Sequence, residues 1–297
     1  MSIHGILCLD KPSDMTSFSC CAVVRRLLGT KKVGHAGTLD PQATGVLPIL
    51  VGNATRALDF LPDHTKRYVA TLRFGAVSDT LDVWGQVSKT NKPLPTKEAV
   101  EAALAAFRGD ILQVPPMVSA LKKDGKRLYD LARQGIEVER EARPVTVHAL
   151  QLLHFDETAG TAVLDCTCSK GTYIRSICDD LGHTLGCGAI MTALRRTVAI
   201  GLSEEQAISL DTARALAEEG TLATRLIPTE IALQEYPPIT VSEAQAVRFR
   251  NGGALALTRL KGEAPTGLTR VCAPDGSFIG LGKPEADELK VARLFLE

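Results

Sequence analysis

Asp40 lies in a loop whose composition could bring a carboxylate close to a ligand. The loop reads GHAGTLDP from Gly34 to Pro41, and a further glycine follows at Gly45. Glycines let a backbone turn tightly and approach another group closely. No Gly-Lys-Ser/Thr follows, so the loop is not a phosphate-binding loop, and local rules assign an aspartate in this setting to an Asx turn. The loop alone leaves open whether Asp40 is catalytic or structural, and the same holds for His35.

A second group of chemically capable side chains lies in the segment CSKGTYIRSI, residues 168–177. Lys170, Tyr173 and Arg175 fall at an expected strand-to-helix turn, where backbone N–H groups favour an anion. Arg175 could be an exposed helix charge or the buried partner of a carboxylate. Burial raises the pKa of a carboxyl group, whereas a guanidinium within about 4–6 Å lowers it. The local pattern is compatible with both roles.

The charge balance argues against a simple basic nucleic-acid binder, because 34 Lys and Arg residues match 34 Asp and Glu residues. The charges are unevenly distributed, however. Residues 1–200 carry a net charge of +4 and residues 201–297 a net charge of −4. A localised positive face and an ordinary mixed surface are both consistent with this distribution.

The eight cysteines indicate neither a disulfide framework nor a zinc ribbon, because no two of them form a C-x-x-C pair. Their densest region, residues 166–187, matches no common zinc pattern, so we expect small buried hydrophobic side chains. No apolar run approaches the roughly 18 residues of a membrane span. The N-terminal apolar run, residues 6–9, is too short for a signal peptide, and we expect a cytoplasmic protein without a metal.

The spacing of apolar residues predicts an α+β chain. Strands are expected at 3–9, 46–51, 66–76, 136–155 and 161–168, and helices before Gly29, from Thr96 to near Gly109 and from Thr172. Tyr236-Pro237-Pro238 is the clearest boundary, because short strand-like runs, glycines and little helical pattern follow it. We therefore expect one domain at 1–236 and a small β-rich domain at 237–297.

The combination and order of the motifs are more informative than any single motif. The chain contains GHAGTLDPQATGVLP, KRY ending at Tyr68, PPMVSALKKDGKRLY, CSKGTYIR and LRRT. In this combination it resembles the bacterial tRNA pseudouridine synthase family called TruB. The tail from Val241 to Leu296 resembles that family's PUA-like RNA-binding domain. The resemblance implies a pseudouridine synthase fold with a mixed, largely antiparallel central sheet flanked by helices, followed by a small β-rich PUA-like domain.

The resemblance also implies an activity, the isomerisation of uridine 55 in the T-loop of tRNA to pseudouridine. Asp40 corresponds to the family's catalytic aspartate, Tyr68 to the tyrosine that lies against the target uracil, and Arg175 to the arginine paired with the aspartate. The reaction conserves atoms and oxidation state, so no cofactor is expected. The sequence leaves open whether Asp40 attacks the sugar carbon, attacks the uracil ring or assists elimination. Tyr68 could stack on the flipped base and remove its C5 proton.

Other residues correspond to family positions that contact or support the substrate. They are His35 of the RNA-facing loop, Tyr173 and Leu194 of the uracil pocket, and Lys11 of a Lys-Pro turn. The chain departs from the family at Ala36, where Thr is frequent, and at Asp14, where Gly is common. Aspartate tolerates left-handed backbone angles better than most residues, so the turn at Asp14 can survive.

The expected partner is tRNA, bound by a monomer that needs neither an obligatory protein partner nor a membrane. One alternative is an RNA-binding or tRNA-folding protein with a dispensable catalytic site. Another is a guide-RNA-dependent relative that requires protein partners. The intact set Asp40, Tyr68 and Arg175 favours an enzyme, and the basic 120–135 segment with a short C-terminal domain favours a stand-alone one. A carboxylate glycosidase fits poorly, since no second acid stands out near Asp40.

Overall fold

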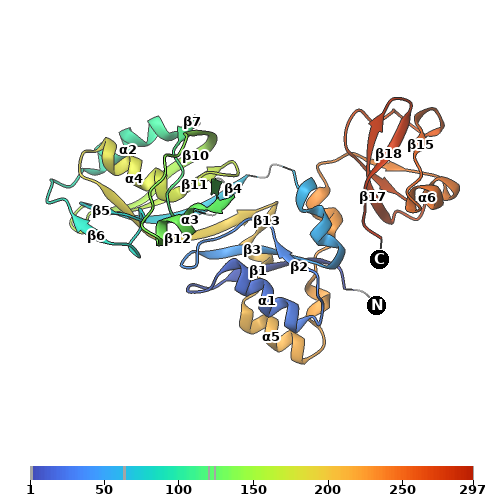
Figure 1. The fold of residues 1–297 in the computed structure, drawn as a ribbon, viewed down its shortest axis with the longest axis horizontal. Coiled ribbons are helices and arrows are strands. Elements are labelled where there is room, and N and C mark those ends of the chain that lie inside the picture. The colour runs from blue at the N-terminus through green and yellow to red at the C-terminus, as the bar shows by residue number, and fades with distance from the viewer. Residues whose placement is uncertain (1–2, 63–64, 120, 124, 297) are drawn as a thin grey trace.

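A computed structural model describes residues 3–62, 65–119, 121–123 and 125–296. Among these residues the strands form a nine-stranded sheet, a separate five-stranded sheet and two small hairpins (Figure 1). The large sheet has the strand order β1 (Gly5–Lys11), β3 (Thr44–Val51), β12 (Ala189–Ala199), β4 (Lys66–Phe74), β11 (Thr161–Cys168), β10 (Arg143–Asp156) and β7 (Gly109–Gln113), with β2 (Val33–His35) paired to β3 and β13 (Leu202–Ser203) paired to β12.

The large sheet is mixed and largely antiparallel, as the family resemblance implied. Its described strand pairs are antiparallel except for β3 and β12, which run parallel through Thr44–Arg195 and Gly45–Arg196. Gly45 has a φ of +99°, and a Cβ atom there would lie 2.2 Å from the carbonyl oxygen of Arg196. Only glycine fits at this position, so Gly45 allows the two strands to meet beside the Asp40 loop.

Helices cover one face of the large sheet and bury the main core. They are α1 (Ser17–Leu27), α2 (Lys97–Ala103), α4 (Ile174–Thr184) and α5 (Leu210–Glu218). Helix α1 packs against β3 and α4 against β12, and their apolar faces contribute Cys20, Val24, Ile177 and Leu181 to the core. The sheet and these helices therefore form the frame on which the Asp40 loop and Arg175 are placed.

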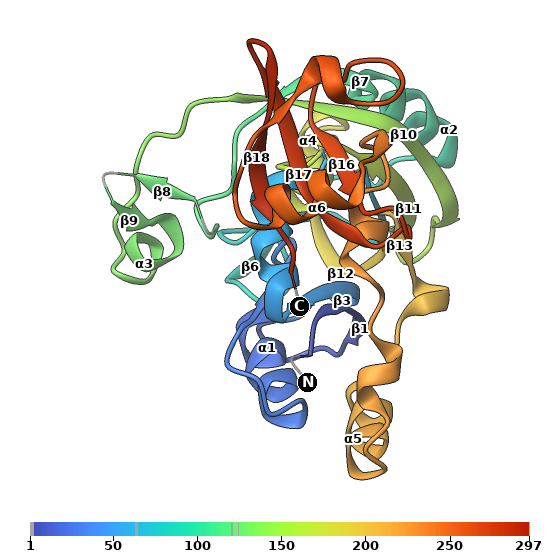
Figure 2. The same ribbon diagram turned by 90° about the vertical axis from the view of Figure 1, so that its right-hand side faces the viewer.

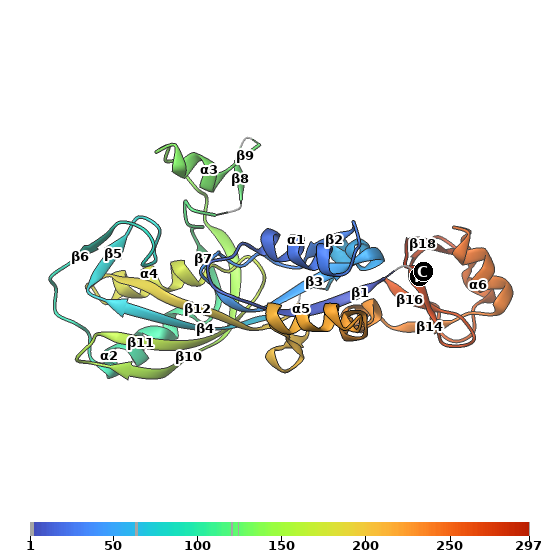
Figure 3. The ribbon, with the colours of Figure 1, turned by 90° about the horizontal axis from the view of Figure 1, so that it is seen from below.

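A small basic projection extends from this frame. It consists of the hairpin β8 (Lys122–Lys123) and β9 (Lys126–Arg127) followed by helix α3 (Leu128–Arg133), and it stands away from both sheets in Figures 2 and 3. Residues 120 and 124 of the predicted basic segment lie outside the described residues. The other small hairpin, β5 (Ala76–Ser78) and β6 (Val87–Lys89), lies at the opposite end of the molecule from the five-stranded sheet (Figures 1 and 3).

The five-stranded sheet lies within residues 238–294. Its strand order is β14 (Pro238–Thr240), β16 (Thr269–Cys272), β17 (Phe278–Glu285), β18 (Glu288–Leu294) and β15 (Leu255–Ala256). A small apolar cluster joins it to the rest of the chain, with Ala57 and Leu233 on one side and Leu281 and Phe295 on the other. The hydroxyl of Tyr236 also donates a hydrogen bond to the carbonyl oxygen of Phe60 at 2.8 Å.

Some predicted elements differ from those observed. Residues 136–142 form no strand, and β10 begins at Arg143, where β7 becomes available as a partner. Helix α4 begins at Ile174, two residues later than predicted. The C-terminal region contains a helix that was missed, α6 (Glu243–Arg250). It buries only Ala246 and Phe249, so its apolar stripe is too weak to recognise, although its Ser242–Gln245 capping box was a usable signal.

The left-handed turn expected near Lys11 is present, since Asp14 has a φ of +61°. The cysteines are buried free thiols, as predicted, and burial raises the pKa of Cys8 to about 12. No helix in the described ranges has the length and apolar composition to cross a membrane.

Candidate active site

Asp40 sits at the exposed tip of the loop that joins β2 to β3. The backbone closes behind it, because the amide of Ala43 donates to the carbonyl oxygen of Asp40 at 3.1 Å and the amide of Met15 donates to that of Pro41 at 3.3 Å. The Asp40 side chain is 44% exposed. Its carboxylate faces Arg175 and accepts no backbone hydrogen bond from the described residues, so the Asx-turn interpretation of Asp40 is wrong.

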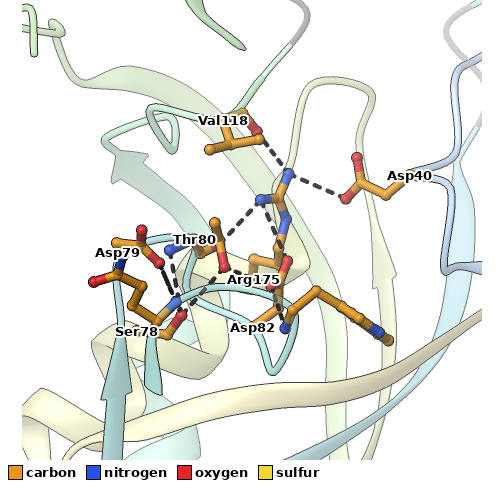
Figure 4. A network of polar contacts seen from close by, with 9 residues as sticks. Asp40, Ser78, Asp79, Thr80, Asp82, Val118 and Arg175 are labelled. Carbon is orange, nitrogen blue, oxygen red and sulfur yellow. Dashed lines mark hydrogen bonds and ion pairs between the residues drawn. The ribbon is translucent and has the colours of Figure 1, made fainter. Parts of the chain in front are cut away.

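Arg175 is the buried partner of this carboxylate (Figure 4). Its side chain is only 4% exposed, and its Nη2 lies 3.1 Å from Oδ2 of Asp40. The same guanidinium donates to the carbonyl oxygens of Thr80 at 3.0 Å and Val118 at 2.8 Å, and its Nη1 lies 3.6 Å from Oδ2 of Asp82. The planar fork is thus held on both sides. The fixed cation stabilises a carboxylate at a half-open site.

Asp82 is a site residue that the sequence reasoning missed. It lies in the loop between β5 and β6, and its side chain is 10% exposed. Oδ1 accepts hydrogen bonds from the hydroxyl of Thr80 at 2.6 Å and from the amide of Trp84 at 3.1 Å, which leaves Oδ2 for Arg175. No local signal marks Asp82 in the sequence, because its partner Arg175 is brought to it only by the sheet.

Lys11 holds the Asp40 loop from one side. Its side chain is fully buried, and Nζ donates to the carbonyl oxygens of Pro12 at 2.8 Å, Met15 at 2.6 Å and Pro41 at 2.8 Å. These acceptors occupy all three donors of an ammonium group. Burial lowers the pKa of Lys11, while the Asp40 carboxylate is one of the charges that oppose this shift. Lys11 therefore supports the loop and contributes positive charge beneath it.

Arg196 holds the other side of the loop, a role that the sequence reasoning did not assign. Its side chain is fully buried. Nε donates to the carbonyl oxygen of Val46 at 2.8 Å and Nη2 to that of Gly37 at 3.0 Å, so one guanidinium ties both ends of the loop together. Ser17 adds a reciprocal pair with Leu39, at 2.9 Å to the amide and 3.1 Å to the carbonyl.

The neighbouring Arg195 points to the other face of β12, as the alternation of a strand predicts. Nη2 of Arg195 lies 3.0 Å from Oδ2 of Asp10, and Arg195 also pairs with Glu204. Its side chain is 40% exposed. The two arginines of the LRRT motif thus have different surroundings, and only Arg196 contacts the Asp40 loop.

Tyr68 and Leu194 lie on the face of the sheet that carries Arg196. Tyr68 on β4 is directly opposite Arg196 on β12, and Leu194 is opposite Ala70, two residues further along. Tyr68 is 7% exposed and Leu194 is 8% exposed. Burial raises the pKa of the Tyr68 hydroxyl, and the positive charge of Arg196 opposes that shift. The phenol is therefore protonated at neutral pH beside a buried cation.

Tyr173 is placed next to the ion pair by the start of α4. Its backbone is bound by Gln113, whose Oε1 accepts from the Tyr173 amide at 2.7 Å and whose Nε2 donates to the Tyr173 carbonyl at 3.0 Å. Burial raises the pKa of Tyr173, and the charges of both Arg175 and Asp40 act on its hydroxyl. Tyr173 thus lies within electrostatic range of the ion pair, two residues before Arg175 at the start of α4.

His35 lies at the end of β2, paired with Ile49 of β3. Its Nδ1 is buried and has no hydrogen-bond partner among the described residues. Burial lowers the pKa of His35, and the charge of Arg196 lowers it further. The imidazole is therefore neutral at pH 7, and it lies outside the Asp40–Arg175 ion pair.

Comparison with known proteins agrees with this arrangement. The family model described as TruB family pseudouridylate synthase (N terminal domain) matches residues 25–174. Those described as tRNA pseudouridylate synthase B C-terminal domain and tRNA Pseudouridine synthase II, C terminal, match residues 175–234 and 236–295. The chain belongs to the TruB family.

Curated members of the TruB family are similar over nearly their whole length. A tRNA pseudouridine synthase B of Caulobacter vibrioides is 42% identical over 99% of this chain and 96% of its own. That of Clostridium perfringens is 42% identical over 99% of this chain and 100% of its own.

The TruB fold of this chain is also found in solved structures of larger assemblies. A chain in an H/ACA RNP bound to a substrate RNA has a TM-score of 0.74 at 22% identity, over 99% of this chain and 85% of that one. A chain from a Cbf5-Nop10-Gar1 complex has a TM-score of 0.74 at 25% identity, and the match covers 98% of this chain and 85% of that one. These similarities confirm the pseudouridine synthase fold.

Proposed function

We propose that this chain isomerises uridine 55 in the T-loop of tRNA to pseudouridine, with the Asp40 carboxylate as the catalytic group. The observation that carries the proposal is the Asp40–Arg175 pair, in which a buried guanidinium holds a carboxylate that is itself 44% exposed. The names of the relatives at 42% identity support tRNA as the substrate.

The reaction needs a base that has left the RNA stack. Unstacking costs a few kcal/mol, least for a base in a loop, and an aromatic ring in the pocket recovers part of it. Tyr68 and Leu194 share the face that carries Arg196, and Tyr173 neighbours the ion pair. These three side chains line the uracil pocket, and His35 fills the place of the flipped base.

The chemistry breaks the bond between N1 and the sugar carbon, rotates the uracil and joins C5 to the same carbon. The proton on C5 must then leave, and N1 gains one, so atoms and electrons balance within the substrate. Asp40 supplies the negative charge for the first step. Lys11 and Arg196 keep its loop in place, because each donates to loop carbonyls on a different side.

Tritium release from C5 tests the function directly. A tRNA transcript labelled with tritium at uridine C5 is incubated with the purified chain, and released tritium is counted. The wild type is expected to release one equivalent per tRNA. Binding of the tRNA without any release would favour the alternative, a tRNA-folding protein with a dispensable site.

The Asp40→Asn substitution is expected to abolish release while tRNA binding, measured by filter retention, stays within about twofold. The amide has nearly the shape of the carboxylate but no charge. A loss of activity without a loss of binding would therefore show that the negative charge acts in the reaction itself. Turnover at the wild-type rate would remove Asp40 from this role.

The Tyr68→Phe substitution separates stacking from proton transfer. We expect kcat to fall by about 10²-fold, the scale of a lost general base, because the ring remains and the hydroxyl is removed. The phenol is protonated at rest, so it must first give up its own proton, and the cation of Arg196 favours that deprotonated form. KM should stay nearly constant. A full rate in this variant would exclude the hydroxyl from proton removal.

The proposal includes a stand-alone monomer that acts in the cytoplasm without an obligatory protein partner. The purified chain alone should be active in the tritium assay, and light scattering during gel filtration should give the mass of one chain, 31.7 kDa. Activity that appears only after addition of a guide RNA or cell extract would contradict this.

A further inference from the structure

A polar cavity lies at the far end of β3 from the Asp40 loop, and the catalytic site does not use it. Its volume is about 540 Å³, and its lining includes His4, Lys31, Lys32, Asn53 and Arg56. No Asp or Glu contributes to the lining among the described residues. The cavity thus has several cationic side chains and no described carboxylate to neutralise them.

The cations come from separate segments that the backbone holds together. Lys31 and Lys32 follow the end of α1, and the Lys32 carbonyl accepts from the amide of Gly52 at 2.8 Å. Gly52 has a φ of +61°, and a Cβ atom there would lie 2.1 Å from Nδ1 of His4. The close approach of these segments therefore depends on glycine at this position.

His4 has a defined hydrogen-bonding role in this cavity. Its Nδ1 accepts from the amide of Asn53 at 2.9 Å, so in the neutral ring Nε2 carries the hydrogen. The side chains of Lys31, Lys32 and Arg56 are exposed and form no hydrogen bond or ion pair with the described residues. These side chains are available as donors for an anion.

Strand β2 connects this cavity to the catalytic loop. Lys32 directly precedes β2, and His35 at its other end leads into the Asp40 loop. The neighbouring β3 has eight residues, or a length of about 27 Å at roughly 3.4 Å per residue. A helical RNA stem that leaves a loop bound at Asp40 can reach the cavity along β2.

We propose that this cavity binds backbone phosphates of the RNA stem that extends beyond the target loop. Phosphates match it because Lys and Arg neutralise them without reading sequence. The inference rests on the proposed function for the identity of the RNA. It adds a second anchoring point that positions the substrate and takes no part in the chemistry.

Two substrates separate this site from the catalytic one. Full-length tRNA has a stem long enough to reach the cavity, whereas a minimal hairpin with only the T-loop and its closing stem ends short of it. The triple variant Lys31→Gln, Lys32→Gln and Arg56→Gln should weaken Kd for tRNA by about tenfold. Its Kd for the hairpin and its kcat on both RNAs should equal those of the wild type.

The salt dependence gives an independent readout. The plot of log association constant against log salt concentration has a negative slope, and its magnitude decreases by about one for each phosphate that the protein no longer neutralises. In the triple variant this magnitude should decrease by about one to three for tRNA and stay unchanged for the hairpin. A control that removes two exposed charges elsewhere is Lys89→Gln with Lys92→Gln, in and just after β6 at the other end of the molecule (Figure 3); the matched comparison is with the double variant Lys31→Gln and Lys32→Gln. This control should leave both affinities unchanged.

An unchanged Kd for tRNA in the triple variant would overturn the proposal. The proposal would also be overturned if the triple variant weakened binding of tRNA and of the hairpin equally, or if the Lys89/Lys92 control weakened tRNA binding as much. In either case the charges would attract RNA from a distance and would not bind it at this cavity. Tritium release by the wild type reports the proposed function separately, since binding of the two RNAs is measured without turnover.

Discussion

The positive charges around Asp40 and those of the basic projection differ in what surrounds them. Lys11 and Arg196 are fully buried, and each donates to several carbonyl oxygens. Lys126 and Arg127 of β9 are exposed, and the guanidinium of Arg127 lies over the ring of Tyr129 at 5.7 Å. A desolvated cation with fixed acceptors determines geometry, whereas a solvated cation attracts a charged partner at longer range.

Among these cations the largest effect is expected at Arg175. The Arg175→Lys variant keeps the charge but has no planar fork to reach Asp40, Thr80 and Val118 together. We expect kcat to fall by about 10²–10³-fold, the scale of losing one fixed electrostatic partner in an active site, with Kd for tRNA unchanged. The tritium assay and filter binding measure the two quantities. A weaker Kd with a normal kcat would place Arg175 with the exposed cations instead.

The next effect is expected at Arg196, with Arg195 as its matched control. Arg196→Lys keeps the charge but replaces the two nitrogens that reach Val46 and Gly37 with a single one, and each carbonyl left unsatisfied costs about 1–3 kcal/mol. Denaturant unfolding should show that the free energy of unfolding falls by about 2–4 kcal/mol. The kcat should fall at least tenfold, because the Asp40 loop is no longer held by the hydrogen bonds of Arg196.

The same change at Arg195 should cost less than about 1 kcal/mol, since that side chain is 40% exposed, and leave kcat intact. Comparable losses at the two positions would break the distinction between buried and exposed cations.

The smallest effect is expected in the projection. The double variant Lys126→Gln and Arg127→Gln should leave both folding stability and kcat unchanged, because these side chains are solvated. The Kd for tRNA should weaken by a few fold, and this difference should disappear at high salt. A change in kcat that persists in high salt would show that the projection also shapes the active site.

Much of the site could be predicted from the sequence because its motifs are contiguous. The resemblance named Asp40, Tyr68, Tyr173 and Arg175, and the structure brings Asp40, Tyr173 and Arg175 together. Helices with a strong apolar stripe, such as α1 and α4, were also recognisable. The short helix α6 was missed because it buries few apolar residues.

The roles of Asp82 and Arg196 could not be predicted. Asp82 matters because one oxygen faces Arg175, and Arg196 matters because its carbonyl acceptors lie about 150 residues earlier in the chain. Such contacts depend on strand order and register, and the parallel pairing of β3 with β12 has no sequence signal of its own.

The sequence by itself determined which chemical groups are present, that one loop carries a carboxylate among glycines, and which family the motifs resemble. Only the tertiary structure decided which arginine holds the Asp40 loop, and that Asp82 lies against Arg175. The reason is physical. Residue type sets the charge and the donors of a side chain, but burial and the positions of distant carbonyls decide whether a charge is solvated, paired or used to hold the backbone.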